Sequence, residues 1–248
     1  MDRQTVRGGQ VMTIEHIPSE SRGRTDLGWL RSRHSFSFGQ YADPARMQYG
    51  ALRVLNDDVV APGAGFPRHP HANMEIVSIP TRGTLRHADS MGHEEDLPAG
   101  DVQVMTAGRG IEHAEYNASD SEDVAFFQIW IRPRAMHLKP RYDQTSFPPD
   151  AMANRLRTIV SPDGRDGSLV MEQDALISRG QFSEPTHLHL SPVFDGNGLY
   201  IFVVEGSVRA APHVAGSRDA LALARPDKPV ELVIAPDTDV LVLDVPTP

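Results

Sequence analysis

Two histidines flank a proline in the stretch FPRHPHANMEIVSIPTRG, residues 66–83. Successive side chains of a β-strand point to opposite faces, so His69 and His71 share a face if the segment is extended. Pro70 favours an extended chain, because proline fixes its own φ and biases the preceding residue away from helix. Two imidazoles aimed the same way can hold a metal ion, whereas an isolated His-X-His pair is more often a coincidence of surface composition.

A second pair, His113 and Glu115, stands in TAGRGIEHAEYN, residues 106–117. If the two segments are neighbouring strands, three imidazoles and one carboxylate surround a point, and an octahedral ion keeps two open positions. Such a donor set suits a divalent transition metal: Fe, Ni, Co, Cu, Mn or Zn. Glu75 has the same parity as His69 and His71, so spacing alone also admits Glu75 as a ligand.

Composition narrows the alternatives. The chain has 248 residues, a net charge of −9 and no cysteine, which excludes disulfides, Fe–S clusters and thiolate zinc sites. The acidic balance and the lack of a dense Lys/Arg block argue against nucleic-acid binding. Residues 1–20 contain no signal-peptide core, and the apolar stretches VAFFQIWI and LYIFVV are too short to cross a bilayer. We therefore expect a cytoplasmic protein without a membrane partner.

The elements that must position these side chains are strands. Short runs rich in Val, Ile and Phe, bounded by turn residues, predict strands at residues 51–60, 74–80, 83–90, 100–108, 125–131, 199–210, 230–236 and 239–245. No segment has a sustained helical spacing of apolar residues. The prediction is an all-β protein of sandwich or barrel type.

A proline-rich segment divides the chain. Pro133, Pro140, Pro148 and Pro149 follow the run FFQIWI, and proline is confined to edges and loops of sheets. A second series of strands begins after this segment. We predict an N-terminal metal-binding domain over residues 1–132, a linker over residues 133–155, and a C-terminal domain over residues 156–248.

At this point the sequence resembles a known family. Gly63 to Glu75 matches the first cupin motif, and Gly100 to Asn117 resembles the second, with Thr106 in place of the usual proline and two extra residues before the histidine. These departures are typical of pirins. The similarity extends through WLRSRHSFSF, ALRVLNDDVV and FFQIWIRP, covers the first half closely and the second half more loosely, and points to bacterial pirins of the quercetin 2,3-dioxygenase type.

The resemblance implies a bicupin fold, with two jelly-roll-like β-sandwich or barrel domains. It also implies a ligand set of His69, His71, His113 and Glu115, with Fe(II) as the expected metal and Glu115 as the catalytic base. Most other cupins use the glutamate of the first motif, which here is Glu75; we place Glu75 beside the site, orienting a histidine.

Other histidines are assigned structural or surface roles. His187 and His189 repeat the His-X-His pattern, but no histidine–glutamate pair follows them, so we expect no metal in the C-terminal domain. His87 and Asp89 form another i, i+2 pair, read as a polar face or a hydrogen bond beside the site. His34 is read as structural, and His93 as solvent-exposed.

The function implied by the resemblance is a metal-dependent dioxygenase that cleaves flavonols such as quercetin with O2 and releases carbon monoxide. An apolar cleft should then receive the flat substrate. The alternative is a metal-dependent redox-sensing or regulatory protein with a protein partner, as some pirins are associated with transcription factors or metabolic enzymes. Since two cupin domains in one chain can pair with each other, we expect a monomer.

Overall fold

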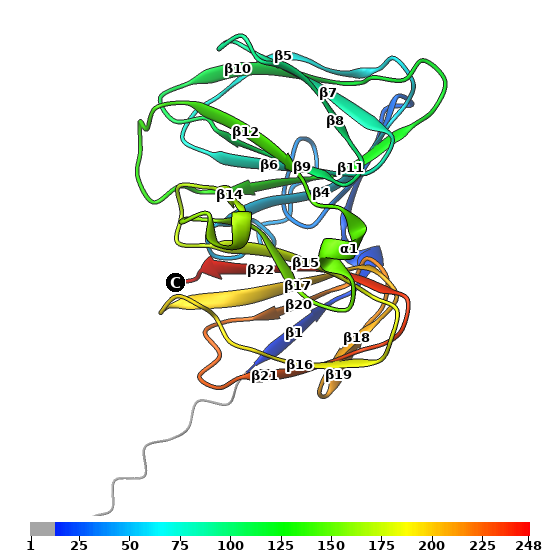
Figure 1. Ribbon diagram of the computed structural model, residues 1–248, viewed down its shortest axis with the longest axis vertical. Coiled ribbons are helices and arrows are strands. Elements are labelled where there is room, and N and C mark those ends of the chain that lie inside the picture. The colour runs from blue at the N-terminus through cyan, green and yellow to red at the C-terminus, as the bar shows by residue number, and fades with distance from the viewer. Residues whose placement is uncertain (1–12) are drawn as a thin grey trace, which may run out of the picture.

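The computed structural model describes residues 13–248, and its regular structure is almost entirely β-strand (Figure 1). Residues 1–12, the start of the predicted N-terminal domain and part of the segment searched for a signal peptide, lie outside the described residues. The helical elements are short: α1 (Pro149–Met152) and two 3-10 turns, Ser19–Ser21 and Arg165–Gly167. Within residues 13–248 no helix has the length and apolar character needed to span a membrane.

The N-terminal domain consists of a seven-stranded and a four-stranded antiparallel sheet. The large sheet has the order β12-β9-β6-β11-β4-β3-β2, and the small sheet has the order β5-β10-β7-β8. In chain order these strands are β2 (Gly23–Asp26), β3 (Leu30–His34), β4 (Leu52–Val60), β5 (Gly65–His71), β6 (Glu75–Arg82), β7 (Thr84–Asp89), β8 (Glu94–Pro98), β9 (Asp101–Thr106), β10 (Ile111–Asn117), β11 (Val124–Ile131) and β12 (Arg141–Ser146).

The C-terminal domain repeats this plan, with a large sheet ordered β1-β20-β17-β22-β15-β13-β14 and a small sheet ordered β16-β21-β18-β19. Its strands are β1 (Ile14–Ile17), β13 (Arg157–Ser161), β14 (Leu169–Val170), β15 (Leu176–Phe182), β16 (Thr186–Leu190), β17 (Asn197–Glu205), β18 (Val208–Ala210), β19 (His213–Ala215), β20 (Ala220–Leu223), β21 (Val230–Ile234) and β22 (Thr238–Pro246). The prediction of an all-β chain with two sandwich-like domains is confirmed.

The two large sheets pack face to face in the middle of the molecule, and the small sheets cover its two ends (Figure 1). Strand alternation explains this arrangement: Val77 and Ile79 of β6 enter the core between the domains, whereas Ile76 of the same strand packs under the small sheet. Phe127 of β11 meets Phe202 of β17 edge-on, with ring centroids 5.5 Å apart. Each fully buried side chain of this size contributes on the order of 2 kcal/mol to folding.

Two segments cross the boundaries expected from sequence. β1 pairs with β20, so a strand near the N-terminus belongs to the C-terminal sheet. β12 lies inside the predicted linker and pairs with β9 at the edge of the N-terminal sheet. Pro140 precedes β12 and Pro148 follows it, so the prolines flank the strand and leave its ladder of hydrogen bonds intact.

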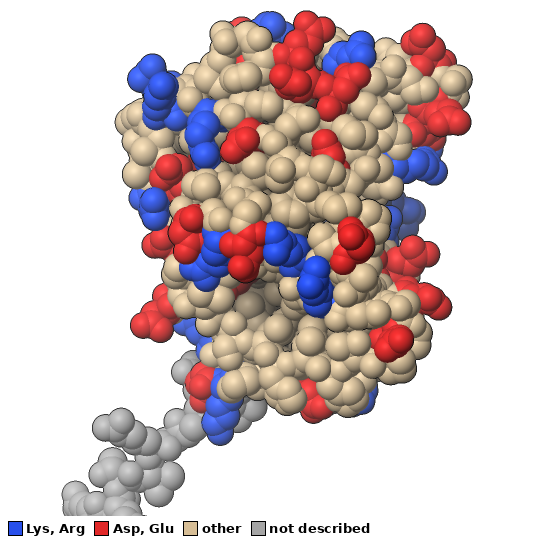
Figure 2. Space-filling model, in the orientation of Figure 1, with Lys and Arg blue, Asp and Glu red and all other residues tan. Residues whose placement is uncertain are grey.

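Charged side chains are mixed over the surface. On the face shown in Figure 2, acidic and basic residues are interspersed, including a mixed band at the level where the two lobes meet. No continuous basic area is visible on this face.

Candidate metal centre

The first His-X-His pair and the His-X-Glu pair lie on adjacent strands of the small N-terminal sheet. β5 and β10 run antiparallel, with His113 opposite His69 and Ile111 opposite His71, and the register shifts between His113 and Glu115. A tight turn at residues 107–110 leads into β10. Gly108 there has a φ of +48°, and a Cβ on it would lie 2.1 Å from the carbonyl oxygen of Leu138, so the approach requires glycine.

Three imidazoles converge at this point. The ring centroids lie 4.8 Å apart for His69 and His71, 4.6 Å for His69 and His113, and 4.8 Å for His71 and His113. One nitrogen from each ring lies within 4.8 Å of the others, which is the spacing of donors that can share one ion. The sequence-based expectation that these three residues come together is therefore met by the geometry.

Burial keeps the imidazoles of His71 and His113 neutral. Desolvation, reinforced by the neighbouring His69, lowers the pKa of His71 to about 4. The same cause, with the surrounding histidines adding to it, lowers the pKa of His113 to about 2. Nε2 of His71 and both ring nitrogens of His113 are buried without a hydrogen-bond partner among the described residues. Neutral rings with unused lone pairs are what a metal ion requires.

A hydrogen bond fixes the tautomer of His69. Its Nδ1 lies 2.7 Å from the carbonyl oxygen of Pro67, and because a carbonyl oxygen only accepts, Nδ1 must carry the proton. Nε2 of His69 is then left with a free lone pair. A backbone carbonyl that orients a histidine in this way is a common support of metal ligands.

Glu115 is buried, as His113 is. Its carboxylate accepts a hydrogen bond of 3.0 Å from Oγ of Ser78 and one of 2.8 Å from Nε2 of Gln128. Burial outweighs these two bonds and raises the pKa of Glu115 to about 7. A carboxyl group that titrates near neutral pH is suited to accept and return a proton.

His87 is more closely involved than the sequence suggested. It stands opposite Glu115 in the register of β7 and β10, is completely buried, and forms with His113 and Glu115 a second group whose ligand atoms lie within 4.8 Å of one another. Its ring stacks on Tyr142 with centroids 4.7 Å apart. Neither ring nitrogen has a hydrogen-bond partner in the described part of the chain; Asp89 approaches only to 3.6 Å.

A small cavity opens in front of this cluster. Its volume is about 50 Å³, and its walls combine aromatic rings with polar groups: Phe38, Asn56, Asp58, Phe66, His69, His71, His113, Glu115, Gln128 and Trp130. The cavity is well below the several hundred Å³ usual for a site that encloses a drug-sized ligand. Its walls are largely apolar, as expected for a flavonol site, but the cavity as it stands admits only a small molecule or the edge of a larger one.

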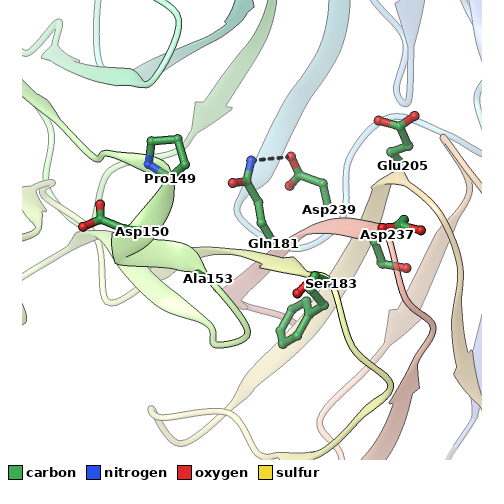
Figure 3. Close-up of a pocket in the computed structure, with 10 residues that line it drawn as sticks. Pro149, Asp150, Ala153, Gln181, Ser183, Glu205, Asp237 and Asp239 are labelled. Atoms are coloured by element: carbon green, nitrogen blue, oxygen red, sulfur yellow. Dashed lines mark hydrogen bonds between the residues drawn. The ribbon is translucent and has the colours of Figure 1, made fainter.

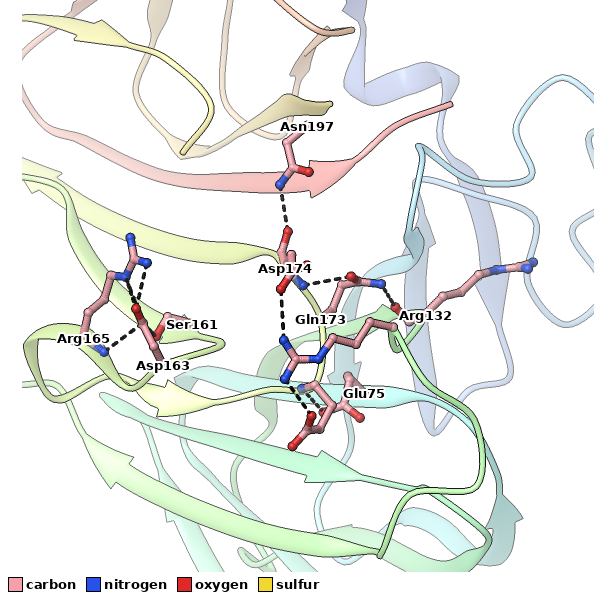
Figure 4. Close-up of polar contacts among 10 residues, drawn as sticks. Glu75, Arg132, Ser161, Asp163, Arg165, Gln173, Asp174 and Asn197 are labelled. Carbon is pink, nitrogen blue, oxygen red and sulfur yellow. Dashed lines mark hydrogen bonds and ion pairs between the residues drawn. The ribbon is translucent and has the colours of Figure 1, made fainter. Parts of the chain in front are cut away.

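The position of Glu75 corrects the sequence-based interpretation. Glu75 points from β6 toward the domain interface (Figure 4), on the sheet face opposite Ser78. Its Oε2 accepts hydrogen bonds from Oγ1 of Thr106 and from the backbone N–H of Glu172. The placement beside a histidine is wrong because Glu75 lies on β6 of the large sheet, and the break between β5 and β6, where Asn73 has a φ of +53°, does not preserve the parity. Burial raises the pKa of Glu75 to about 7, and its Oε1 has no partner among the described residues.

The remaining histidines fall outside the cluster. His187 and His189 are exposed on β16, and Nδ1 of His187 lies 3.0 Å from Glu231. His34 is buried and hydrogen-bonded to Asn56 and Thr25, a structural role. His93 is partly exposed and bonds Asp89 at 2.8 Å.

A larger cavity, of about 560 Å³, lies where α1 meets β15 and the start of β22 (Figure 3). Its walls carry carboxylates, including Asp150, Glu205 and Asp237, together with Asp239, which is ion-paired to Arg179. No histidine lines it. The donor atoms suited to a transition metal therefore lie at the smaller cavity.

Several residues that line the small cavity were not predicted from the sequence. Asn56 and Asp58 interrupt the apolar run of β4, and Gln128 interrupts that of β11; all three side chains are buried. Polar residues that alternate with apolar ones in strands covered on both faces are a readable sign of an interior polar site. Asp58 fits this pattern, since burial raises its pKa to about 7 despite a short hydrogen bond from Ser32.

Comparison with known proteins identifies the family. Residues 17–131 match the Pirin family model, and residues 158–245 match the model of the quercetinase C-terminal cupin domain. A quercetin 2,3-dioxygenase from Escherichia coli strain K12 is 40% identical over 229 residues, which span 92% of this chain and 96% of that protein. This chain belongs to the pirin family.

The pirin is also similar to solved structures. The bacterial pirin YhhW from Escherichia coli, solved in complex with nickel(II), is 38% identical, covers 95% of this chain with 100% of its own length, and superimposes with a TM-score of 0.89. A pirin-like protein from Caulobacter vibrioides is 45% identical over 60% of this chain and 63% of its own length. The resemblance to quercetin 2,3-dioxygenase-like pirins and the bicupin fold are confirmed.

Proposed function

We propose that this pirin is a metal-dependent dioxygenase that cleaves flavonols such as quercetin with O2 and releases carbon monoxide. The observation that carries the proposal is the convergence of three imidazoles and one buried carboxyl group on a cavity. The names of its relatives support the choice of substrate, because quercetin 2,3-dioxygenase is the name of the Escherichia coli protein that matches almost the whole chain.

His69, His71, His113 and Glu115 form the proposed ligand set. This set of imidazoles and a carboxylate fits a divalent transition metal, of which Fe(II) is our first choice and Ni, Co, Cu, Mn and Zn are alternatives. Nickel has support from the relative solved with nickel(II). A bound ion would supply Lewis acidity and redox chemistry at the base of the cavity.

Glu115 is the proposed proton acceptor. One carboxylate oxygen of Glu115 would take the proton from the 3-hydroxyl group of a flavonol and return it at the end of the reaction. Ser78 and Gln128 each donate to a different oxygen of Glu115, so they hold the carboxyl group in place and stabilise its ionised form. His87, facing Glu115 across the strands, supports this end of the site.

The size of the cavity constrains how a flavonol binds. About 50 Å³ holds O2 or the hydroxy-ketone edge of the substrate, and the remaining rings must lie over the mouth of the cavity. Phe38, Phe66 and Trp130 provide aromatic walls for such stacking. Trp130 also packs edge-on against His71, with centroids 4.9 Å apart, and so links the substrate wall to a proposed ligand.

The test is oxygen-dependent consumption of quercetin by the iron-reconstituted protein, followed by the loss of flavonol absorbance with trapping of carbon monoxide. We expect turnover in the wild-type protein and none in the His71→Ala protein. Turnover that survives the His71→Ala substitution, or that yields no carbon monoxide, would contradict the proposal.

A second function, metal-dependent redox sensing or regulation through a protein partner, is favoured by the small cavity alone. In that case a change in the charge of the metal centre alters the surface around His69, which is only partly buried. Binding of one ion per chain without quercetin turnover would support this function over the dioxygenase.

A further inference from the structure

A different cavity lies at the seam between the two domains. Its volume is about 260 Å³, and it is lined by Ser19, Glu20, Arg22, Arg24, Arg33, Asp57, Ser217 and Arg218. Arg24, Arg33 and Asp57 lie on β2, β3 and β4 of the N-terminal sheet, and Arg22 immediately precedes β2. Ser217 and Arg218 come from the loop between β19 and β20. None of these residues has a role in the proposed dioxygenase reaction.

Positive charge is in excess in this cavity. Four arginines face two carboxylates, those of Glu20 and Asp57. Asp57 serves two of the arginines at once: its Oδ2 lies 2.8 Å from Nε of Arg218 and 3.7 Å from Nη1 of Arg22. One carboxylate shared between two guanidinium groups leaves the rest of the cavity cationic.

Two further arginines stand directly opposite each other. Arg24 of β2 and Arg33 of β3 are register partners, and like charges in that position destabilise a sheet. Neither side chain forms an ion pair with another residue in the described range 13–248. An anion placed between the two guanidinium groups would turn this repulsion into attraction.

Arg22 is held in the floor of the cavity at a cost. Its side chain is 2% exposed, donates to the carbonyl oxygen of Arg33, and lies over the ring of Phe202 in the other domain. Burial lowers the pKa of Arg22, and the nearby Arg218 and Arg33 lower it further, while Asp57 opposes the shift. Its Nε is buried and has no hydrogen-bond partner among the described residues.

The seam is held together by a reciprocal pair of contacts. Arg22, from the N-terminal sheet, lies 5.0 Å from the ring centroid of Phe202, and Arg218, from the C-terminal domain, lies 5.4 Å from that of Phe127. Both guanidinium groups also line the cavity. A ligand that contacts both guanidinium groups would therefore touch both domains at once.

We propose that this seam cavity binds a small dianionic ligand, with a phosphate group as its recognised part. The excess of about two positive charges matches a phosphate at neutral pH, and several guanidinium groups around one point suit a group with three terminal oxygens better than a single carboxylate. The volume leaves room for a phosphate ester of a small metabolite.

The test uses the full-length, metal-loaded protein in a low-salt chloride buffer. Inorganic phosphate, glycerol 3-phosphate and malonate are titrated separately by calorimetry, and thermal unfolding is recorded with each. We expect phosphate and glycerol 3-phosphate to bind and raise the unfolding temperature. A site for free phosphate should bind inorganic phosphate more tightly than glycerol 3-phosphate. A site for a phosphate ester should bind glycerol 3-phosphate with a Kd at least tenfold lower than that of inorganic phosphate.

Arg33→Gln and Arg31→Gln are the matched variants. Both remove one positive charge from β3, but Arg31 is exposed, ion-paired to Asp123 and absent from the cavity wall. We expect Arg33→Gln to weaken phosphate binding at least tenfold and Arg31→Gln to leave it nearly unchanged. Without ligand, Arg33→Gln should unfold close to the temperature of the wild type, because it removes both the like-charge pair with Arg24 and the opposite-charge pair with Asp57 of β4.

Three results would overturn the proposal. They are the absence of binding by either phosphate probe, equal weakening by both variants, and tighter binding of malonate than of either phosphate compound. Phosphate bound at the metal centre is recognised by its insensitivity to Arg33→Gln.

Discussion

The two domains share one architecture but fill it with different chemistry. The interior of the C-terminal domain is apolar, with Leu199, Ile201, Val203, Leu221, Leu232 and Ile234 among its buried residues. The interior of the N-terminal domain holds buried polar residues at comparable depth: Asn56, Asp58, Ser78, His87, Gln103, His113, Glu115 and Gln128. One domain uses the sandwich as a stable core, and the other uses it to enclose a reactive cluster.

The comparison between β5 and β16 shows how little sequence separates these outcomes. Both strands carry His-X-His in a small sheet, but in β16 Leu188 and Leu190 pack against the core while His187 and His189 face outward. Because side chains alternate with a period of two, shifting a strand by one residue moves its buried side chains to the exposed face and its exposed side chains to the buried face. The motif alone therefore does not identify a metal site; its facing and its neighbours do.

The largest expected effect is loss of the metal from the N-terminal cluster. His113→Ala removes the imidazole common to both donor groups, so bound metal should fall from one ion per chain to near zero. His189→Ala is the control in the C-terminal domain and should leave the metal content unchanged. Elemental analysis of the dialysed proteins measures both, and equal losses in the two variants would remove the contrast between the domains.

The apolar interior should be the more sensitive one to loss of volume. Ile201→Ala leaves a cavity under the C-terminal sheet and should lower the free energy of unfolding by about 2–5 kcal/mol. Gln103→Leu is the counterpart in the N-terminal domain: both amide atoms of Gln103 are buried without a partner in the described structure, so this change should be neutral or stabilising. Urea unfolding measures both, and a large loss for Gln103→Leu would mean that its amide is well bonded.

Two buried glutamates with similar pKa values lie in different regions: Glu115 in the metal cluster and Glu75 at the domain interface. The folded pKa of Glu75, about 7, lies above its usual 4.5, so its contribution to stability is fully present below about pH 4.5 and is lost as the pH rises to about 7. Glu75→Gln should therefore gain stability relative to the wild type over that range, by up to about 3 kcal/mol. Its metal content should stay unchanged, unlike that of Glu115→Gln.

Thermal unfolding of the wild type and Glu75→Gln across this pH range gives the difference directly. The buried histidines contribute to both proteins and cancel in the subtraction. If the difference in unfolding temperature does not change with pH, or if Glu75→Gln loses metal, Glu75 must instead support the metal site.

The smallest effect is expected at His87. Replacing it with Gln keeps a polar side chain of similar reach but removes the imidazole from the group with His113 and Glu115. Metal affinity should fall by about 10–100-fold, the range typical of groups that support a ligand. Competition with a chelator measures this affinity, and an unchanged value would make His87 a packing residue for Tyr142 alone.

The sequence was sufficient to predict the all-β class, the two domains and the meeting of His69, His71 and His113, because these follow from strand periodicity and motif spacing. Glu75 was misplaced because parity holds only within one strand, and the turn at Asn73 separates it from β5. His87 was undervalued since its partner strand, β10, is distant in sequence. The pairing of β1 with β20 was likewise a long-range contact with no local signal.

The metal centre proposed for the N-terminal domain consists of three histidines (His69, His71 and His113) and Glu115. X-ray absorption at the metal edge of the loaded protein counts imidazole ligands directly. We expect three imidazoles and oxygen donors in the wild type, two imidazoles in His71→Ala, and no change in His189→Ala. An imidazole count that His71→Ala leaves unaltered would contradict this ligand set.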